Sequence, residues 1–182
     1  MARRQLRIFG DPILRQRAIE VEDFDGSLRK LVEDMSDTMI EENGAGLAAP
    51  QIGVGLRVFV YGVDDEEDED NMSIRHIVNP VLIEQSVEEI EDVEGCLSIP
   101  GLRYDLLRPR RIVAQGFNMH GEPITIEGTE RVARALAHET DHLDGILFVD
   151  RLDEERRKEA LREIRLLILD GENVMVKESP HS

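Results

Sequence analysis

The chain has 182 residues, of which 41% are hydrophobic and 4% aromatic. This length and composition fit one globular domain with an aliphatic core, and they exclude a disordered chain. Acidic residues outnumber basic residues by 39 to 22, which gives a net charge of −17 at pH 7. General nucleic-acid binding requires a positive surface, so we expect no direct nucleic-acid recognition.

The number of cysteines and the search for targeting segments limit the cellular compartments that we expect for this protein. Cys96 is the single cysteine, so no disulfide can form within the chain. The N-terminus has arginines but lacks the apolar segment of a signal peptide. No apolar run approaches the ~20 residues that span a membrane. We therefore expect a cytoplasmic protein without a membrane partner.

The first half of the chain predicts one helix and then strands. Apolar residues recur at spacings of three and four over residues 27–42, with Ser27 as the N-cap and Asn43-Gly44 as the stop. The glycine-rich segment 44–51 breaks this helix. The acidic run 64–70 repels itself and predicts a loop at about 64–72. Strands are predicted at 57–62, 75–83, 87–93, 111–117 and 124–126, with turns at His120-Gly121 and Gly128.

Two helices are predicted in the second half. One covers residues 129–143, capped by Thr129, and one covers residues 153–169, followed by a loose tail at 171–182. Because the connections between strands are short, antiparallel or mixed pairing is favoured over crossovers. We therefore expect a single α+β catalytic domain over residues 1–182, in which antiparallel or mixed sheets pack around a central metal-binding helix, with N-terminal and C-terminal helices.

The chemistry-bearing segment is the pentapeptide His138-Glu139-Thr140-Asp141-His142. Histidines at i and i+4 lie on one helix face, roughly 5–6 Å apart at Cβ, and can hold one metal ion. The glutamate between them can act as a general base in metal-assisted hydrolysis. A helix with two surface histidines is the alternative reading of so short a motif.

Two further segments favour hydrolysis. A catalytic metal site takes three protein ligands and leaves one position open, and Cys96 can supply the third ligand. A small buried thiol is the alternative for Cys96. In the segment 44–51 the backbone can approach an extended substrate, and Gln51 has an amide that can donate to a developing oxyanion.

Together, these segments resemble the motifs of the peptide deformylase family, and the order and approximate spacing agree. The resemblance covers about residues 6–170. The matching motifs are Gly44-Ala45-Gly46-Leu47-Ala48-Ala49-Pro50-Gln51, Glu94-Gly95-Cys96-Leu97-Ser98 and His138-Glu139-Thr140-Asp141-His142-Leu143-Asp144-Gly145, with a family-like opening at Gly10-Asp11-Pro12-Ile13-Leu14-Arg15.

This resemblance implies a metal-dependent hydrolase that removes the formyl group from the N-terminal formyl-methionine of nascent polypeptides and releases formate. It implies that Cys96, His138 and His142 hold one divalent metal ion per chain, natively Fe(II), with zinc, nickel or cobalt as substitutes. Its substrates are N-formylmethionyl peptides.

The resemblance also implies roles around the metal. Glu139 is the general base and acid, and Gln51 forms an oxyanion hole with the backbone N–H of Leu97. The residues assigned to substrate binding are Gly44, Ala45, Gly46, Gly95 and Arg103.

Departures from the family pattern lie one turn before the first histidine. Ala137 stands where many members have glutamine. Arg131 and Arg134 stand where some members have apolar residues that line the methionine pocket, and we expect both arginines to extend outward to solvent. If either faced the pocket, the preference for methionine would change.

Alternatives remain at this point. HExxH also serves metallopeptidases, although a third His or Glu at a short downstream spacing is missing. A non-catalytic metal-binding module is the second alternative, and it would need neither Glu139 nor Gln51. Basic residues on the helix at 153–169 suggest a ribosome partner, because emerging chains are the substrate.

Overall fold

The computed structural model describes residues 3–64 and 72–177, with side chains described as far as residue 171. The strands are β1 (Gly46–Ala48), β2 (Val58–Asp64), β3 (Met72–Gln85), β4 (Glu89–Cys96), β5 (Ile99–Pro109), β6 (Arg111–Phe117) and β7 (Pro123–Thr129). The helices are α1 (Gly26–Glu41), α2 (Arg131–Leu143) and α3 (Glu154–Lys177), with short 3-10 helices η1 (Pro12–Arg15), η2 (Ala49–Ile52) and η3 (Phe148–Arg151). The acidic run predicted as a loop lies outside the described residues from 65 to 71.

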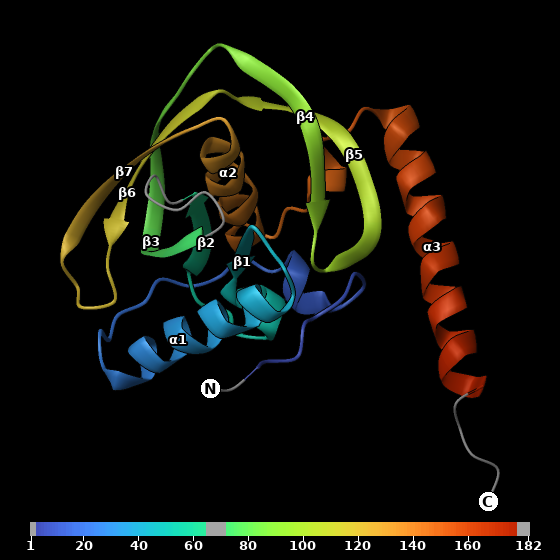
Figure 1. Ribbon diagram of the computed structural model, residues 1–182, viewed down its shortest axis with the longest axis horizontal. Helices are drawn as coiled ribbons and strands as arrows, with labels where there is room; N and C mark the ends of the chain where they lie inside the picture. Colours follow the sequence, from blue (N-terminus) through green and yellow to red (C-terminus); the bar gives the residue numbers. More distant parts are fainter. Residues whose placement is uncertain (1–2, 65–71, 178–182) are drawn as a thin grey trace, which may run out of the picture.

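Antiparallel pairing joins the named strands into two sheets. One sheet has five strands in the order β1-β2-β3-β6-β7, and the other is the β4–β5 hairpin. Helix α2 contacts strands of both sheets and occupies the centre of the fold (Figure 1). The α+β class is therefore confirmed, and the position of α2 is consistent with the predicted central motif helix.

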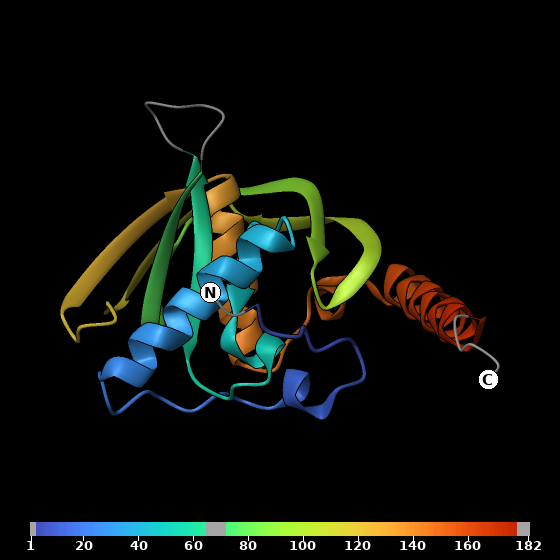
Figure 2. The same cartoon turned by 60° about the horizontal axis from the view of Figure 1, so that its bottom comes forward.

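Strand β2 is covered on both of its faces. Val58 and Val60 join a cluster with Met35 and Met39 of α1, whereas Phe59 joins a second cluster with the side chains of α2. Successive side chains of a strand point to opposite faces, so an apolar run is expected where both faces are buried. Figure 2 shows α1 crossing this strand, while α3 projects away from the body.

The predicted first helix is confirmed, but its predicted cap is wrong. The N-cap is Asp25, whose Oδ1 accepts hydrogen bonds from Ser27 N at 3.0 Å and Leu28 N at 3.1 Å. The carboxylate reaches two unpaired N–H groups of the first turn, which stabilises a helix beginning one residue earlier. The predicted stop is confirmed, because Asn43 takes a positive φ of 54° and Gly44 N donates to Met39 O.

The start of α2 also differs from the prediction. Thr129 ends β7 and does not cap the helix, and Gly128 lies inside β7 instead of in a turn. A Cβ on Gly128 would lie 2.7 Å from Val132 Cγ1, so the glycine allows α2 to pack closely on this strand. The predicted turn at His120-Gly121 is confirmed.

Helix α3 is longer than predicted, since it continues past residue 169 to Lys177. Gly171 does not end the helix, because a lone glycine costs a helix only about 1 kcal/mol. Residues 178–182 of the predicted loose tail lie outside the described residues. Within the described part of the chain, no helix is long and apolar enough to cross a membrane.

Candidate metal centre

Two histidines of α2 face one point in the interior. His138 and His142 are both buried, and their Nε2 atoms lie 3.2 Å apart. Leu136 and Leu143 lie in the core cluster shared with the five-stranded sheet. Their packing fixes the rotation of α2 and so aims the two imidazoles toward the hairpin.

Cys96 brings the third donor from the end of β4. Its Sγ lies 3.3 Å from His142 Nε2, and the ligand atoms of the three residues all lie within 4.8 Å of one another. The pairing of β4 with β5 shifts register between Gly95 and Cys96, and such an irregularity re-aims a side chain. Two imidazole nitrogens and one sulfur thus converge, a donor set that fits one divalent metal with a further position open.

Burial and neighbouring groups set the protonation of the histidines. Burial, with the positive charge of His138, lowers the pKa of His142 well below its ordinary value. Burial also acts to lower the pKa of His138, but contacts with Cys96 and Glu94 outweigh it and raise that pKa. Because a metal takes the neutral imidazole, metal binding here would compete with a proton on His138.

Glu139 lies between the histidines as a buried carboxyl group. Its Oε2 has no hydrogen-bond partner among the described residues. Burial raises the pKa of Glu139 to about 7, against the opposing positive charge of His138. A carboxyl group that titrates near neutral pH can both accept and return a proton.

Glycines let the backbone of β1 approach this carboxyl group. A Cβ on Gly46 would overlap with Glu139 Oε1 and lie 2.9 Å from its Cδ. A Cβ on Gly44 would lie 2.6 Å from Leu97 Cδ1. Neither glycine has a positive φ, so the close approach alone accounts for the absence of a side chain.

Gln51 is held rigidly in η2 beside the sulfur. Its Oε1 accepts from Ala48 N at 2.9 Å, and its Nε2 donates to Ser98 Oγ at 3.1 Å. The same Nε2 lies 3.6 Å from Cys96 Sγ. The amide donor therefore points at the space next to the three converging ligand atoms.

A cavity of about 1180 Å³ opens over these groups. Cys96, Leu97, His138, Glu139 and Gln51 contribute to its lining. The residues predicted to bind substrate line the same cavity: Gly44, Ala45, Gly46, Gly95 and Arg103. His142 lies beneath the lining, buried at the back of the site.

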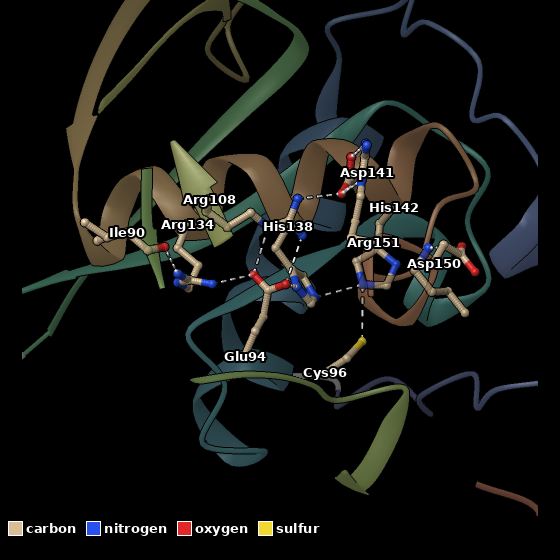
Figure 3. Close-up of polar contacts among 11 residues, drawn as sticks. Ile90, Glu94, Cys96, Arg108, Arg134, His138, Asp141, His142, Asp150 and Arg151 are labelled. Atoms are coloured by element: carbon tan, nitrogen blue, oxygen red, sulfur yellow. Dashed lines mark hydrogen bonds and ion pairs between the residues drawn. The ribbon is translucent and has the colours of Figure 1, made fainter. Parts of the chain in front are cut away.

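A buried ionic network behind the ligands was not predicted. Arg108 donates to both oxygens of Glu94 and, through Nη1, to Asp141 Oδ2 at 2.8 Å. Arg151 Nη2 donates to Asp141 Oδ1 at 2.8 Å. Glu94 Oε2 lies 3.6 Å from His138 Nδ1 (Figure 3). The network therefore connects the first histidine to β4, β5 and η3.

The charge of Glu94 is maintained despite its burial. Burial acts to raise its pKa, but His138 and Arg108 outweigh it and hold the pKa at about 2. Glu94 and Asp141 lie in the same short motifs as the metal-ligand candidates, but their positions in those motifs do not indicate these ionic contacts. Arg108 lies in none of the motifs.

The two arginines that precede the motif behave differently. Arg131 is exposed, as predicted, and pairs with Asp64 at 3.6 Å. The prediction for Arg134 is wrong, because its side chain is 10% exposed and Nη2 donates to Ile90 O at 3.0 Å. The inward ion pair with Glu94 holds this guanidinium inside (Figure 3). Ala137 packs in the core and does not line the cavity over Glu139.

Fold and site together define a mononuclear metal hydrolase: an HExxH helix between two sheets, a third ligand from a hairpin, a buried carboxyl group and an amide donor in one cavity. The polypeptide deformylase family model matches residues 3–158. The peptide deformylase of Acidothermus cellulolyticus is 54% identical over 181 residues, covering 100% of this chain and 96% of that protein. The peptide deformylase of Parafrankia sp. is 50% identical over 182 residues, covering 100% of this chain and 96% of that protein.

Solved structures agree. The crystal structure of a peptide deformylase from Legionella pneumophila superposes with a TM-score of 0.84 at 38% identity, covering 98% of this chain and 100% of that one. The chain belongs to the polypeptide deformylase family. It is a metal-dependent enzyme of the kind that removes N-terminal formyl groups from nascent peptides.

Proposed function

We propose that Cys96, His138 and His142 hold the catalytic metal ion of this deformylase, and that it is natively Fe(II), with zinc, nickel or cobalt as substitutes. The convergence of the three ligand atoms within 4.8 Å is the observation that supports this assignment. One sulfur and two nitrogens suit each of these metals. When bound, a divalent metal supplies Lewis acidity, which lowers the pKa of water to about 7.

The protein groups then move the proton. Glu139 accepts a proton from the attacking water, because its buried carboxyl group titrates at about 7. It returns that proton to the nitrogen of the leaving amine as the bond to the formyl carbon breaks. Formate and a peptide with a free amino terminus are the products.

The developing negative charge on the formyl oxygen needs donors that are already in place. We assign this role to Gln51 Nε2, held by its bonds to Ala48 and Ser98, and to the backbone N–H of Leu97. Gly44, Ala45, Gly46, Gly95 and Arg103 line the cavity and bind the formylmethionyl peptide along its main chain. The glycines leave room for a backbone against Glu139 and Leu97.

An assay of two substrate classes tests the activity. Formate release from formyl-Met-Ala is compared with cleavage of an unblocked peptide bond, as a metallopeptidase would perform. We expect formate without peptide cleavage; the opposite pattern would exclude deformylation. Metal analysis of protein purified without oxygen, combined with the formate assay, identifies the native metal.

We further propose that the enzyme works in the cytoplasm, close to the ribosome, where nascent chains emerge. Helix α3 projects away from the body (Figure 2), and most of its basic side chains are exposed. These residues are Arg157, Lys158, Arg162 and Arg165, with Arg156 half-buried. Salt-sensitive cosedimentation with ribosomes is the expected result, and its absence at low salt would exclude this partner.

A further inference from the structure

Helix α2 borders two separate cavities. His138 and Glu139 line the cavity of the candidate metal centre, whereas Thr140 and Asp144 line a second cavity of about 950 Å³. Among the described residues, none lines both cavities. A ligand in the second cavity would therefore contact the helix that carries the two histidines without occupying the space above Glu139.

Arg57 is a buried cation with donors that remain available in this second cavity. Its side chain is 8% exposed, and its Nη1 donates to Leu143 O at 3.0 Å and lies 3.0 Å from Asp144 Oδ1. Nε and Nη2 have no hydrogen-bond partner among the described residues, and neither nitrogen is fully enclosed by protein. Because an unpaired donor in a buried guanidinium is costly, a ligand that brings acceptors to these two nitrogens would be favoured.

Arg17 adds an exposed cation beside Arg57. Leu143 O, which accepts from Arg57 Nη1, also accepts from Ala18 N at 2.9 Å, so the backbone next to Arg17 lies close to the buried guanidinium. Arg17 lines the same cavity and has no ion pair within the part of the chain that the structure describes. Asp144 offsets one of these two positive charges, and the other is uncompensated.

The remaining charges limit a ligand to a single negative charge. Five arginines and five acidic residues line the cavity, so it has no general excess of positive charge. Asp141 is already bound by Arg108 and Arg151, whereas Glu89 and Glu91 lie at exposed positions of β4. A dianion would be repelled by these acids, while a monoanion can use the one uncompensated charge.

Apolar side chains provide surface for more than an inorganic ion. Val81 of β3 and Leu107 of β5 both line the cavity, and they are 61% and 53% exposed. Covering these side chains with an apolar group would remove hydrocarbon surface from water, which is favourable. Ligand sites commonly combine such apolar walls with a few polar groups that fix the orientation of the ligand.

We infer that the second cavity binds an organic monocarboxylate with an apolar body. The carboxylate lies on Nε and Nη2 of Arg57 next to Arg17, and the apolar body lies against Val81 and Leu107. These two guanidinium nitrogens form one edge and match the two oxygens of a carboxylate. Arg108 uses the same edge to hold the carboxylate of Glu94. The site goes beyond deformylation and does not depend on it.

Nuclear magnetic resonance of the zinc-loaded enzyme tests the ligand class through the Nε–H signals of its arginines. Hexanoate should shift the signals of Arg17 and Arg57 until they saturate. Acetate should shift the same signals with at least about tenfold lower affinity, because it lacks the apolar chain. Hexylammonium and inorganic phosphate, at the same ionic strength, should leave both signals in place. No shift with hexanoate, an equal shift with hexylammonium or tighter binding of phosphate would overturn the inference.

Variants test the two arginines. Arg17→Leu and Arg57→Gln should each lower the affinity for hexanoate about tenfold or more, because each removes a charged donor. Arg75→Leu removes the same charge from an exposed position on β3 outside both cavities and should keep the wild-type affinity. Wild-type affinity in Arg17→Leu would overturn the assignment, and this exposed variant decides the question even if Arg57→Gln does not fold.

The location of the shifts separates the two cavities. Hexanoate could also bind at the candidate metal centre, where it would shift the side-chain amide of Gln51 and the backbone amide of Leu97. Shifts at those amides without shifts at Arg17 and Arg57 would overturn the inference. Formate release from formyl-Met-Ala is measured on the same preparation, so a failure of the proposed function is recorded independently of hexanoate binding.

Discussion

Arg108 holds the carboxylate of Glu94 with two of its nitrogens, Nε at 3.1 Å and Nη2 at 2.9 Å. Both side chains are buried, and Glu94 Oε2, which accepts from Arg108 Nη2, also lies 3.6 Å from His138 Nδ1. A carboxylate behind a ligating histidine fixes the orientation of the ring and raises its basicity. The ion pair between Arg108 and Glu94 thus fixes the carboxylate that orients the His138 ring.

Replacing Glu94 should weaken metal binding. Glu94→Gln keeps the volume but removes the charge that faces His138 and Arg108, so we expect a 10–100-fold loss of metal affinity, of the order of other losses behind metal ligands. Breaking a buried ion pair should also lower the free energy of unfolding by about 3–5 kcal/mol. Chelator competition and urea titration measure the two effects. Glu91→Gln, at an exposed position of the same strand, is the matched control, and equal metal affinity in both variants would contradict the role of Glu94.

Replacing Cys96 should remove the metal. Cys96→Ala leaves only the two imidazoles of α2, so the variant should be purified with little bound metal and release no formate. Metal content per chain is the direct measurement. Full occupancy in this variant would exclude Cys96 from the ligand set.

Replacing Glu139 should separate binding from chemistry. In Glu139→Ala the metal content should stay normal, while kcat falls by at least about 10²–10⁴, because the group that accepts and returns the proton is lost. Metal analysis and the formate assay are run on the same preparation. Unchanged turnover would contradict the mechanism.

Replacing Gln51 should change kcat more than it changes the metal content of the protein. Gln51→Ala removes one donor to the developing oxyanion, for which a loss of about 10²–10³ in kcat is typical. Ser98→Ala removes only the acceptor that orients Gln51 Nε2, so its effect on kcat should be smaller. If both variants kept the wild-type kcat, the amide would have no catalytic role.

The N-terminal segment should make stability depend on pH. Asp34 accepts from Arg4 Nη2 at 2.8 Å and from Lys30 Nζ at 3.2 Å. Burial acts to raise the pKa of Asp34, but these partners outweigh it and lower the pKa below its ordinary 3.8. A carboxyl group whose pKa is lower in the folded protein than in the unfolded chain stabilises the fold at pH values above its unfolded pKa. This stabilisation is lost as the pH falls through its folded pKa.

Urea titrations at pH values from neutral to below 3.8 measure how the free energy of unfolding depends on the charge of Asp34. Asp34→Asn should be less stable than wild type at neutral pH, and the difference should narrow as the medium becomes acidic. Glu33→Gln, at an exposed position next to it, should follow the wild-type curve. A constant difference between Asp34→Asn and wild type across this range would exclude the linkage.

Local patterns explain which elements could be predicted. Apolar periodicity identifies α1, and the apolar run at the start of β2 identifies a buried strand. Strand β5 is missed because its buried positions mix Leu102 and Leu106 with the charged Arg108, so it lacks an apolar alternation. Strand β5 forms because its backbone pairs with β4, and its composition does not predict this pairing.

The same distinction between local sequence patterns and contacts that form only in the fold applies to the residues of the candidate site. His138, Glu139 and His142 lie in a motif whose spacing indicates its chemistry, whereas the roles of Cys96 and Gln51 are implied by the resemblance of their motifs to the family. Arg108 could not be assigned, because the hairpin register pairs it with Ile90, and its side chain reaches the carboxylate of Glu94, fourteen positions away, only in the folded structure. Arg134 was placed outside, since a lone arginine normally reaches solvent and its buried partners are visible only in the fold.

The arrangement of the ligands has a mechanical consequence. Cys96 belongs to the two-stranded hairpin, whereas His138 and His142 belong to the helix that packs on the larger sheet. A two-stranded sheet is only marginally stable by itself, so a metal ion held by the three proposed ligands would connect the hairpin to the helix and the larger sheet. Chelation should therefore speed hydrogen exchange at the amides of β4 while those of β2 stay protected, and it would loosen the walls of the substrate cleft at the same time as it stops turnover.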